Sequence, residues 1–110
     1  MPHLVIDHAP VLAEPLAAAL PALHDLLASA GFAPASIKVY ARPLGHHVVG
    51  GAADAPMAHV ALRTLDKPER TEAMRRAWLG DVMDALAERL PPCTLTGEAV
   101  CLPAVYQSGA

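Results

Sequence analysis

Proline at position 2, directly after the initiator methionine, is the residue with the clearest chemical potential in this chain. The initiator methionine is normally trimmed when the next residue is small, and trimming would turn Pro2 into a free secondary amine. An ordinary α-amino group has a pKa of about 7.7–8.0. Burial and nearby cations both lower that pKa, because both disfavour the protonated form. In such surroundings Pro2 would be a neutral base near pH 7, as proton abstraction beside a carbonyl requires.

Polar side chains that could act together with Pro2 occur in four places along the chain. His3 follows it directly and could line the same pocket. Lys38, Tyr40 and Arg42 lie in or just after an alternating apolar segment, and either Tyr40 or Tyr106 could supply a hydroxyl that polarises an oxyanion. A segment of mixed charge holds five further cations, of which one or two could face a site: Arg63, Lys67, Arg70, Arg75 and Arg76.

Metal-ligating and disulfide patterns are weak. His46 and His47 have no third ligand at a usual spacing, so no metal site is predicted. Cys93 and Cys101 would lie about 26 Å apart on one continuous strand, and could pair only if the chain turned at Gly97. In the cytoplasmic compartment expected for this chain, two buried free thiols are predicted.

The elements that must position these residues follow from hydrophobic periodicity. The first strand has a fully apolar centre at Leu4–Ile6, which is typical of burial on both faces. A firm helix is predicted from Pro21 to a stop at Gly31, with room for an earlier turn. In the third strand, His59, Ala61 and Arg63 are expected on one face, opposite Val60, Leu62 and Thr64. The predicted order is β-α-β followed by β-α-β, over residues 3–8, 21–30, 36–41, 57–65, 66–90 and 94–105.

The second helix is expected to begin at Asp66, with Glu69 as the reciprocal partner of this N-cap. It should end before Pro91, and an apolar stripe along it is expected to pack into the core: Met74, Trp78, Val82, Met83, Leu86 and Leu90. A helix that joins two neighbouring strands makes those strands parallel. We therefore predict a single α/β domain over residues 1–110, an α+β two-layer sandwich with a mixed sheet and two helices on one face.

The amino-acid composition disfavours several classes of function. Eight basic residues do not outnumber eleven acidic ones, so no nucleic-acid partner is expected. Glu14, His24 and Asp25 interrupt the longest apolar run, so no membrane span is predicted, and the start lacks a secretory signal. A cytoplasmic location is the expectation.

The composition also favours an oligomer. With only 4% aromatic residues a lone subunit has a modest core, and its exposed sheet edges need covering by another chain.

The residues Met1-Pro2-His3-Leu4-Val5-Ile6, followed by this order of elements, resemble the tautomerase superfamily. Within it the chain is most similar to the 5-carboxymethyl-2-hydroxymuconate isomerases, whose pattern also matches Gly31-Phe32-x-Pro34, Ile37 and the strand containing His59 and Leu62. The resemblance implies a cofactor-free homotrimer of β-α-β-β-α-β subunits. In it the N-terminal proline, Pro2, is the general base that shifts a proton between carbons of an enol or keto acid from aromatic compound catabolism.

The resemblance also implies cations on the second strand and near the second helix that hold a small-molecule carboxylate. On the second strand Lys38 and Arg42 are the alternatives, and near the helix Arg70 competes with Lys67 and Arg63. The predicted site therefore has Pro2 as the catalytic residue and five substrate-binding residues: Arg42, Lys38, Arg70, Tyr40 and His3. Two other functions stay open: dehalogenation or decarboxylation with Pro2 as an acid, and a non-catalytic trimeric binding protein in which Pro2 is blocked.

Overall fold

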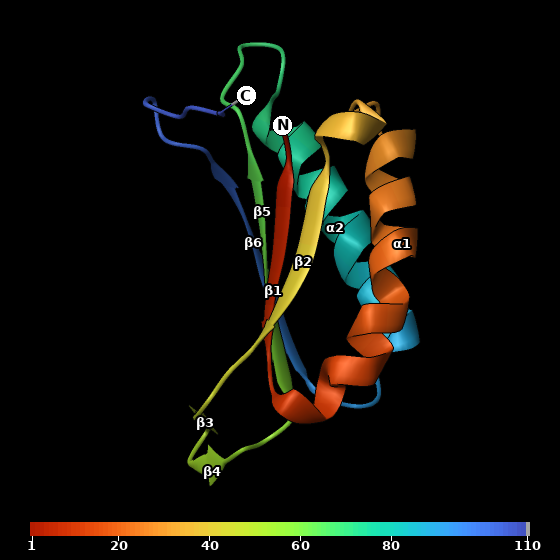
Figure 1. Cartoon of the computed structure of the whole chain (residues 1–110), viewed down its shortest axis with the longest axis vertical. Coiled ribbons are helices and arrows are strands. Elements are labelled where there is room, and N and C mark those ends of the chain that lie inside the picture. Colours follow the sequence, from red (N-terminus) through yellow and green to blue (C-terminus); the bar gives the residue numbers. More distant parts are fainter. Residues whose placement is uncertain (110) are drawn as a thin grey trace.

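A computed structural model describes residues 1–109, in which two helices cover one face of a four-stranded sheet (Figure 1). This mixed α+β architecture is the predicted one. The elements are β1 (His3–His8), η1 (Pro10–Leu12), α1 (Ala13–Ser29), η2 (Pro34–Ser36), β2 (Lys38–Pro43), β3 (Val48–Val49), β4 (Ala52–Ala53), β5 (Met57–Thr64), α2 (Glu72–Arg89) and β6 (Thr94–Cys101).

The strand order is β2-β1-β5-β6, so β2 and β6 are the edges of the sheet. β1 pairs in parallel with β2 and antiparallel with β5, and β5 pairs in parallel with β6. Both helices thus connect parallel strands, as the sequence predicted. In this register His3 of β1 lies between Lys38 of β2 and Arg63 of β5, which places three polar residues side by side at one end of the sheet.

The hydrophobic core lies between the sheet and the helices. In β1 the consecutive residues Leu4, Val5 and Ile6 are all buried, as predicted, and β5 contributes a buried side chain at every second position, among them Val60 and Leu62. The intervening residues of β5, among them His59 and Arg63, are more exposed. This alternation confirms the predicted faces of β5, because successive side chains of a strand point to opposite sides of the sheet.

Helix α1 is longer than predicted. It begins at Ala13, and Pro21 lies inside it rather than at its start. The buried side chains Leu16 and Ala19 precede the proline and continue the stripe that Leu23 and Leu27 complete. Pro21 costs the helix one backbone hydrogen bond and a steric conflict with the preceding turn, although its ring lies on the exposed side. Burial of the apolar side chains in the first half of the helix outweighs that cost.

The stretch Pro10–Ser29 is also long and apolar enough to cross a membrane by length and composition, with a mean hydropathy of 1.4. Glu14, His24 and Asp25 interrupt this stretch, as expected, but its average hydropathy stays high because almost all the other residues are apolar. In this fold the segment is a core helix, since its buried stripe packs against the sheet and α2.

Helix α2 begins later than predicted, and the proposed cap at Asp66 was wrong. Thr71 is the N-cap, and its hydroxyl accepts a hydrogen bond from the backbone N–H of Met74 at 3.1 Å. Residues 65–70 before it are irregular. Because the helix starts five residues downstream, Glu69 and Arg70 belong to a connecting segment beside the N-terminal end of β1.

The last strand ends at Cys101 instead of continuing to residue 105, and the chain then leaves the sheet. Cys93 precedes this strand and Cys101 closes it; both are free thiols, as predicted. The expectation that both are buried was wrong: Cys101 is exposed, because β6 is an edge strand, and Cys93 is only half-buried.

Between β2 and β5 a small hairpin of β3 and β4 projects from the opposite end of the sheet (Figure 1). Gly50 and Gly51 adopt φ values of 57° and 83° at its turn, a conformation that favours glycine. His47 contacts the carbonyl oxygen of Ala55 through Nε2. Within residues 1–109, no three His, Cys, Asp or Glu side chains are placed to share a metal ion.

Candidate active site at the N-terminal end of the sheet

Pro2 lies immediately before β1, and its side chain is fully buried. Its carbonyl oxygen accepts a hydrogen bond from the backbone N–H of Lys38 at 3.1 Å, so the residue is tied to the neighbouring strand. In Figure 1 the N-terminus, the segment between β5 and α2 and the end of the chain all lie at this end of the sheet. Pro2 is therefore held rigidly where three separate segments meet.

Three cations surround the α-amino group, which in the untrimmed chain belongs to Met1. Its pKa is lowered from the ordinary value of 8.0, first by burial and then by the positive charges of Arg70, Lys67 and Lys38. Trimming of Met1 would move the amine one residue inward, to Pro2, within the same cationic surroundings. These surroundings favour the neutral form of an amine, which is the form that accepts protons.

Arg70 is fixed in place by two contacts. Its Nη1 atom donates to the carbonyl oxygen of Leu65 at 3.2 Å. Its guanidinium carbon lies 5.1 Å from the centroid of the Phe32 ring, a cation–π distance. Phe32 in turn packs edge to face on Trp78, with ring centroids 4.9 Å apart. Phe32 and Trp78 thus form a rigid aromatic support that holds the guanidinium of Arg70 in place.

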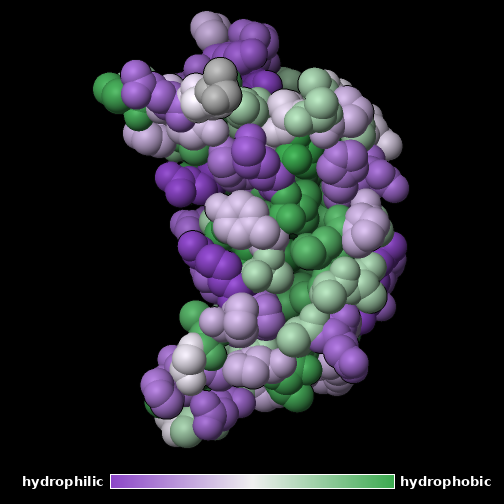
Figure 2. Space-filling view, in the orientation of Figure 1, coloured by the Kyte–Doolittle hydropathy of each residue, from purple (hydrophilic) through white to green (hydrophobic). Residues whose placement is uncertain are grey.

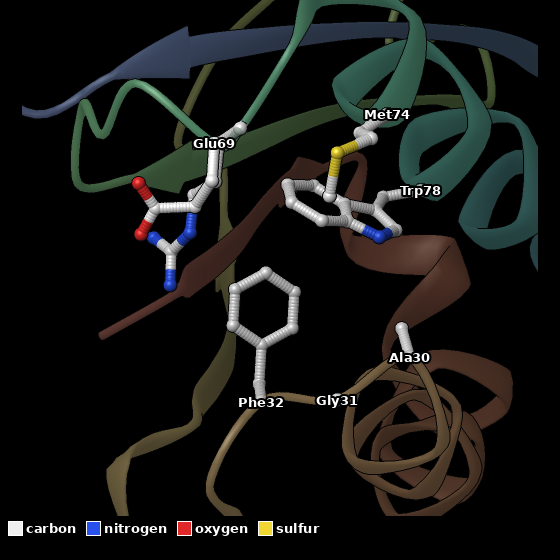
Figure 3. A pocket seen from close by; sticks show the side chains of 7 residues that line it. Ala30, Gly31, Phe32, Glu69, Met74 and Trp78 are labelled. Atoms are coloured by element: carbon white, nitrogen blue, oxygen red, sulfur yellow. The ribbon is translucent and has the colours of Figure 1, made fainter.

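This support borders an open cavity of about 220 Å³ (Figure 3). In the close-up, the ring of Phe32 and the indole of Trp78 lie near one another, with Met74 over the indole and Glu69 on the other side. The end of α1, the segment before α2 and the first turns of α2 supply its lining: Ala30, Gly31, Phe32, Glu69, Arg70, Met74 and Trp78. The cavity combines apolar walls with one cation, Arg70, and one carboxylate, Glu69. Apolar walls with a few polar groups are typical of small-molecule sites.

His3 lies on the helix-free side of the sheet, and its Nε2 atom lies 2.8 Å from the hydroxyl oxygen of Tyr106. The two rings meet edge to face with centroids 5.8 Å apart. The pKa of His3 is lowered from 6.5, first by burial and then by the charges of Lys38, Arg63 and the N-terminus. The imidazole is therefore neutral at pH 7, beside two permanent cations.

The structure does not bring all the predicted site residues together. Arg42 forms a two-pronged ion pair with Asp7, with N–O distances of 2.8 and 3.0 Å. It lies four residues along β2 from Lys38, about 13 Å at about 3.3 Å per residue, at the far end from Pro2. Tyr40 lies between these two positions, paired with Val5 and 40% exposed.

Pro2, His3, Lys38 and Arg70 thus gather at one end, and of the alternatives Arg63 and Lys67 join them. Sequence reasoning missed the aromatic support of Arg70, because it assigned Met74 and Trp78 to the core stripe of α2. Their spacing of four residues on a helix predicts a shared face but not whether that face is covered.

No protein-family model and no curated protein matches this sequence. Among solved structures, similar folds include 5-carboxymethyl-2-hydroxymuconate delta-isomerase, with a TM-score of 0.77 and 24% identity over 100% of this chain and 88% of that one. Pt0534 inactivated by 2-oxo-3-pentynoate is similar with a TM-score of 0.82 and 21% identity, over 98% of this chain and 91% of that one. A fused 4-OT symmetric trimer has a TM-score of 0.74 and 12% identity, over 91% and 86%.

The resemblance to the tautomerase superfamily is confirmed by these likenesses at the level of the fold. At these identities the likeness says nothing about which residues act or on which substrate.

Proposed function

We propose that this protein is a cofactor-independent isomerase that moves a proton within an unsaturated enol or keto acid, with the amine of Pro2 as general base. The observation that carries the proposal is the buried N-terminal end of β1, where burial and three cations lower the pKa of the α-amino group of Met1, whose surroundings the amine of Pro2 would share. The fold shared with isomerases supports the reaction class.

In the proposed reaction, the neutral amine of Pro2 takes a proton from the hydroxyl or the α-carbon of the substrate. The electron pair left behind is delocalised as a dienolate, and the protonated amine returns the proton to another carbon. Nothing is oxidised or reduced, so no redox cofactor takes part. Proton transfer by a positioned base contributes typically about 10²–10⁴-fold to the rate.

Lys38 and Arg70 are proposed to bind the carboxylate and to stabilise the negative charge of the dienolate. Arg70 faces the 220 Å³ cavity, whose apolar walls would hold the carbon chain of the substrate. Arg63 and Lys67 add positive charge at the same end. The cations therefore serve twice: they attract the anionic substrate and keep Pro2 unprotonated.

The lowered pKa favours a base over an acid at this position. An amine acting as an acid, as in the dehalogenation or decarboxylation alternative, must be protonated in the resting enzyme. Burial next to Lys38, Lys67 and Arg70 opposes that state. Base catalysis is the assignment that agrees with the local electrostatics.

A homotrimer is part of the proposal. Among residues 1–109, no further strand lies beside the edge strands β2 and β6. Figure 2 shows hydrophobic side chains gathered in a band along the middle of one side of the molecule. Exposed edges and apolar bands are usually covered by another chain, and the similar 4-OT fold is a symmetric trimer. Light scattering of the purified protein should give three times the subunit mass.

Intact-mass spectrometry of the purified protein is the first test, because only a chain that lacks Met1 has Pro2 as its terminal amine. Retention of Met1 would overturn the proposal, since the nitrogen of Pro2 would then be an amide.

The second test is the rate of ketonisation of arylpyruvate or hydroxymuconate-type enols by Pro2→Ala, with Arg42→Ala as a matched control far from the amine. We expect a loss of about 10²-fold or more in kcat for Pro2→Ala, and an unchanged rate would exclude Pro2 as the base.

Covalent labelling gives an independent readout. In 2-oxo-3-pentynoate the alkyne is conjugated to the ketone, so a neutral amine can add to the distal alkyne carbon while the neighbouring carbon gains a proton. We expect one added inhibitor per subunit, located on Pro2 by peptide mass spectrometry, with loss of activity in step with labelling. Labelling on any other residue, at equal rates with and without Pro2, would count against a neutral amine at this site.

A further inference from the structure

The contact between His3 and Tyr106 joins two residues separated by 103 positions, at the same end of the sheet as Pro2. We propose that Tyr106 is a positioning residue, which fixes His3 in one ring orientation and one tautomer beside the N-terminal amine. This inference rests on the proposed function for its effect on the rate, but its structural part can be tested without any activity.

The end of the chain reaches His3 by crossing the sheet. After β6 the backbone N–H of Leu102 donates to the carbonyl oxygen of Thr64 at 2.7 Å, which attaches the segment to the end of β5. Leu102 itself is buried. From this anchor four more residues bring the hydroxyl of Tyr106 to 2.8 Å from Nε2 of His3 on β1. The segment therefore runs from β6 over the end of β5 to β1, and it is held at both places.

The charges around His3 decide which partner donates the hydrogen bond. Lys38 on β2 and Arg63 on β5 face the imidazole and oppose its protonation, as does the N-terminal amine whenever it is charged. A neutral imidazole has one nitrogen lone pair to offer. A phenol hydroxyl is more acidic than a neutral imidazole N–H, so Tyr106 donates to Nε2. The ring proton then resides on Nδ1, because the hydrogen bond at one nitrogen sets the protonation of the other.

This arrangement leaves the Nδ1–H of His3 without a hydrogen-bond partner among the described residues. The Nδ1–H of His3 is an uncharged donor next to Lys38, and the cations around the ring attract an anionic substrate. A donor held in one orientation can bind a substrate oxygen without a reorientation step. Tyr106 acts on the reaction through His3, so its removal should lower kcat more than it raises KM.

Tyr106→Phe tests the proposal, since it keeps the ring and removes only the hydroxyl. Nitrogen-15 NMR of the histidine rings in the whole protein at pH 7.5 should show wild-type His3 with its proton on Nδ1 and an unprotonated Nε2. In the variant both tautomers should be populated. We expect kcat/KM to fall between about twofold and about tenfold, the effect of one intramolecular hydrogen bond. Gln107→Ala, in the same exposed segment, is the control and should match the wild type in both measurements.

Three results would overturn the proposal. The first is a wild-type His3 whose proton resides on Nε2, and the second is an identical tautomer distribution in Tyr106→Phe. The third is a changed tautomer with unchanged kcat/KM in a protein that catalyses ketonisation. If the wild type catalyses no ketonisation, the proposed function fails, while the NMR comparison still decides whether Tyr106 positions His3.

Discussion

The backbone N–H of Lys38 donates to the carbonyl oxygen of Pro2 across 3.1 Å. This bond begins the parallel ladder between β1 and β2, and it sets the register in which Lys38 lies opposite His3. A slip of this register by one residue would turn Lys38 to the core side of the sheet. The position of the cation nearest to Pro2 on β2 therefore depends on a backbone contact of Pro2 itself.

Replacement of Lys38 should affect both binding and the basicity of the amine. In Lys38→Ala we expect KM to rise about tenfold or more for a carboxylate substrate, because a charged contact is lost. The pKa of the amine should rise, since one of the charges that lower it is gone. Steady-state kinetics over a range of pH measure both effects. Lys38→Arg keeps the charge and is the matched control; if Lys38→Ala shows the same KM and the same pH profile as that control, Lys38 does not contact the substrate.

The pH dependence of the wild-type enzyme follows from the lowered pKa of the amine. A general base must be neutral, so kcat/KM should rise with increasing pH and level off once the amine has lost its proton. Burial and cations lower the pKa of the α-amino group of Met1 from its ordinary value, and the same surroundings would lower that of the Pro2 amine. The rise should therefore be complete at a lower pH than the same amine would need in water. A profile that falls with pH through this range would instead indicate an acid role for Pro2.

Arg42→Ala should leave the reaction unchanged, in contrast to the variants at the other end of β1. The side chain is 58% exposed and paired with Asp7, whose side chain is 30% exposed. Exposed ion pairs contribute little to stability, because water and salt screen the two charges. Urea unfolding should therefore show a midpoint close to that of the wild type, with kcat/KM equal to that of the wild type. A large loss of activity in a folded variant would show that Arg42 reaches a site, for example that of a neighbouring subunit.

Pro21→Ala should stabilise the protein. Pro21 lies within α1 on its exposed side, and a proline in a helix interior is up to about 3 kcal/mol less favourable than alanine. The substitution restores a backbone donor and removes a steric conflict with the preceding turn. Thermal unfolding followed by circular dichroism should show a higher Tm. Pro34→Ala, at the start of a short 3-10 helix where proline is well placed, is the control and should not be stabilising. A lower Tm for Pro21→Ala would mean that the helix is shaped around the proline.

Short-range patterns in the sequence were enough to predict the architecture. The apolar Leu4–Ile6 centre and the alternation of β5 each depend on the period of a strand, which the chain carries locally. Helix boundaries were predicted less well. Asp66 and Thr71 are both good N-caps by residue type, and Pro21 is a plausible helix start. The choice between such alternatives depends on which side chains become buried, and burial is decided by distant parts of the chain.

The features of the candidate site also fall into two groups: those that the sequence could identify and those that only the structure could. Residue type and position alone singled out Pro2, because only an N-terminal proline can become a secondary amine. They could not rank Lys38 against Arg42, since both lie on the same face of one strand and only the register with β1 shows which is near Pro2. Nor could they pair His3 with Tyr106, at opposite ends of the chain. What the sequence determined by itself was the chemistry of single residues and the period of the elements. Tertiary structure decided which charges and hydroxyls meet, because those contacts arise only when segments far apart in the chain pack together.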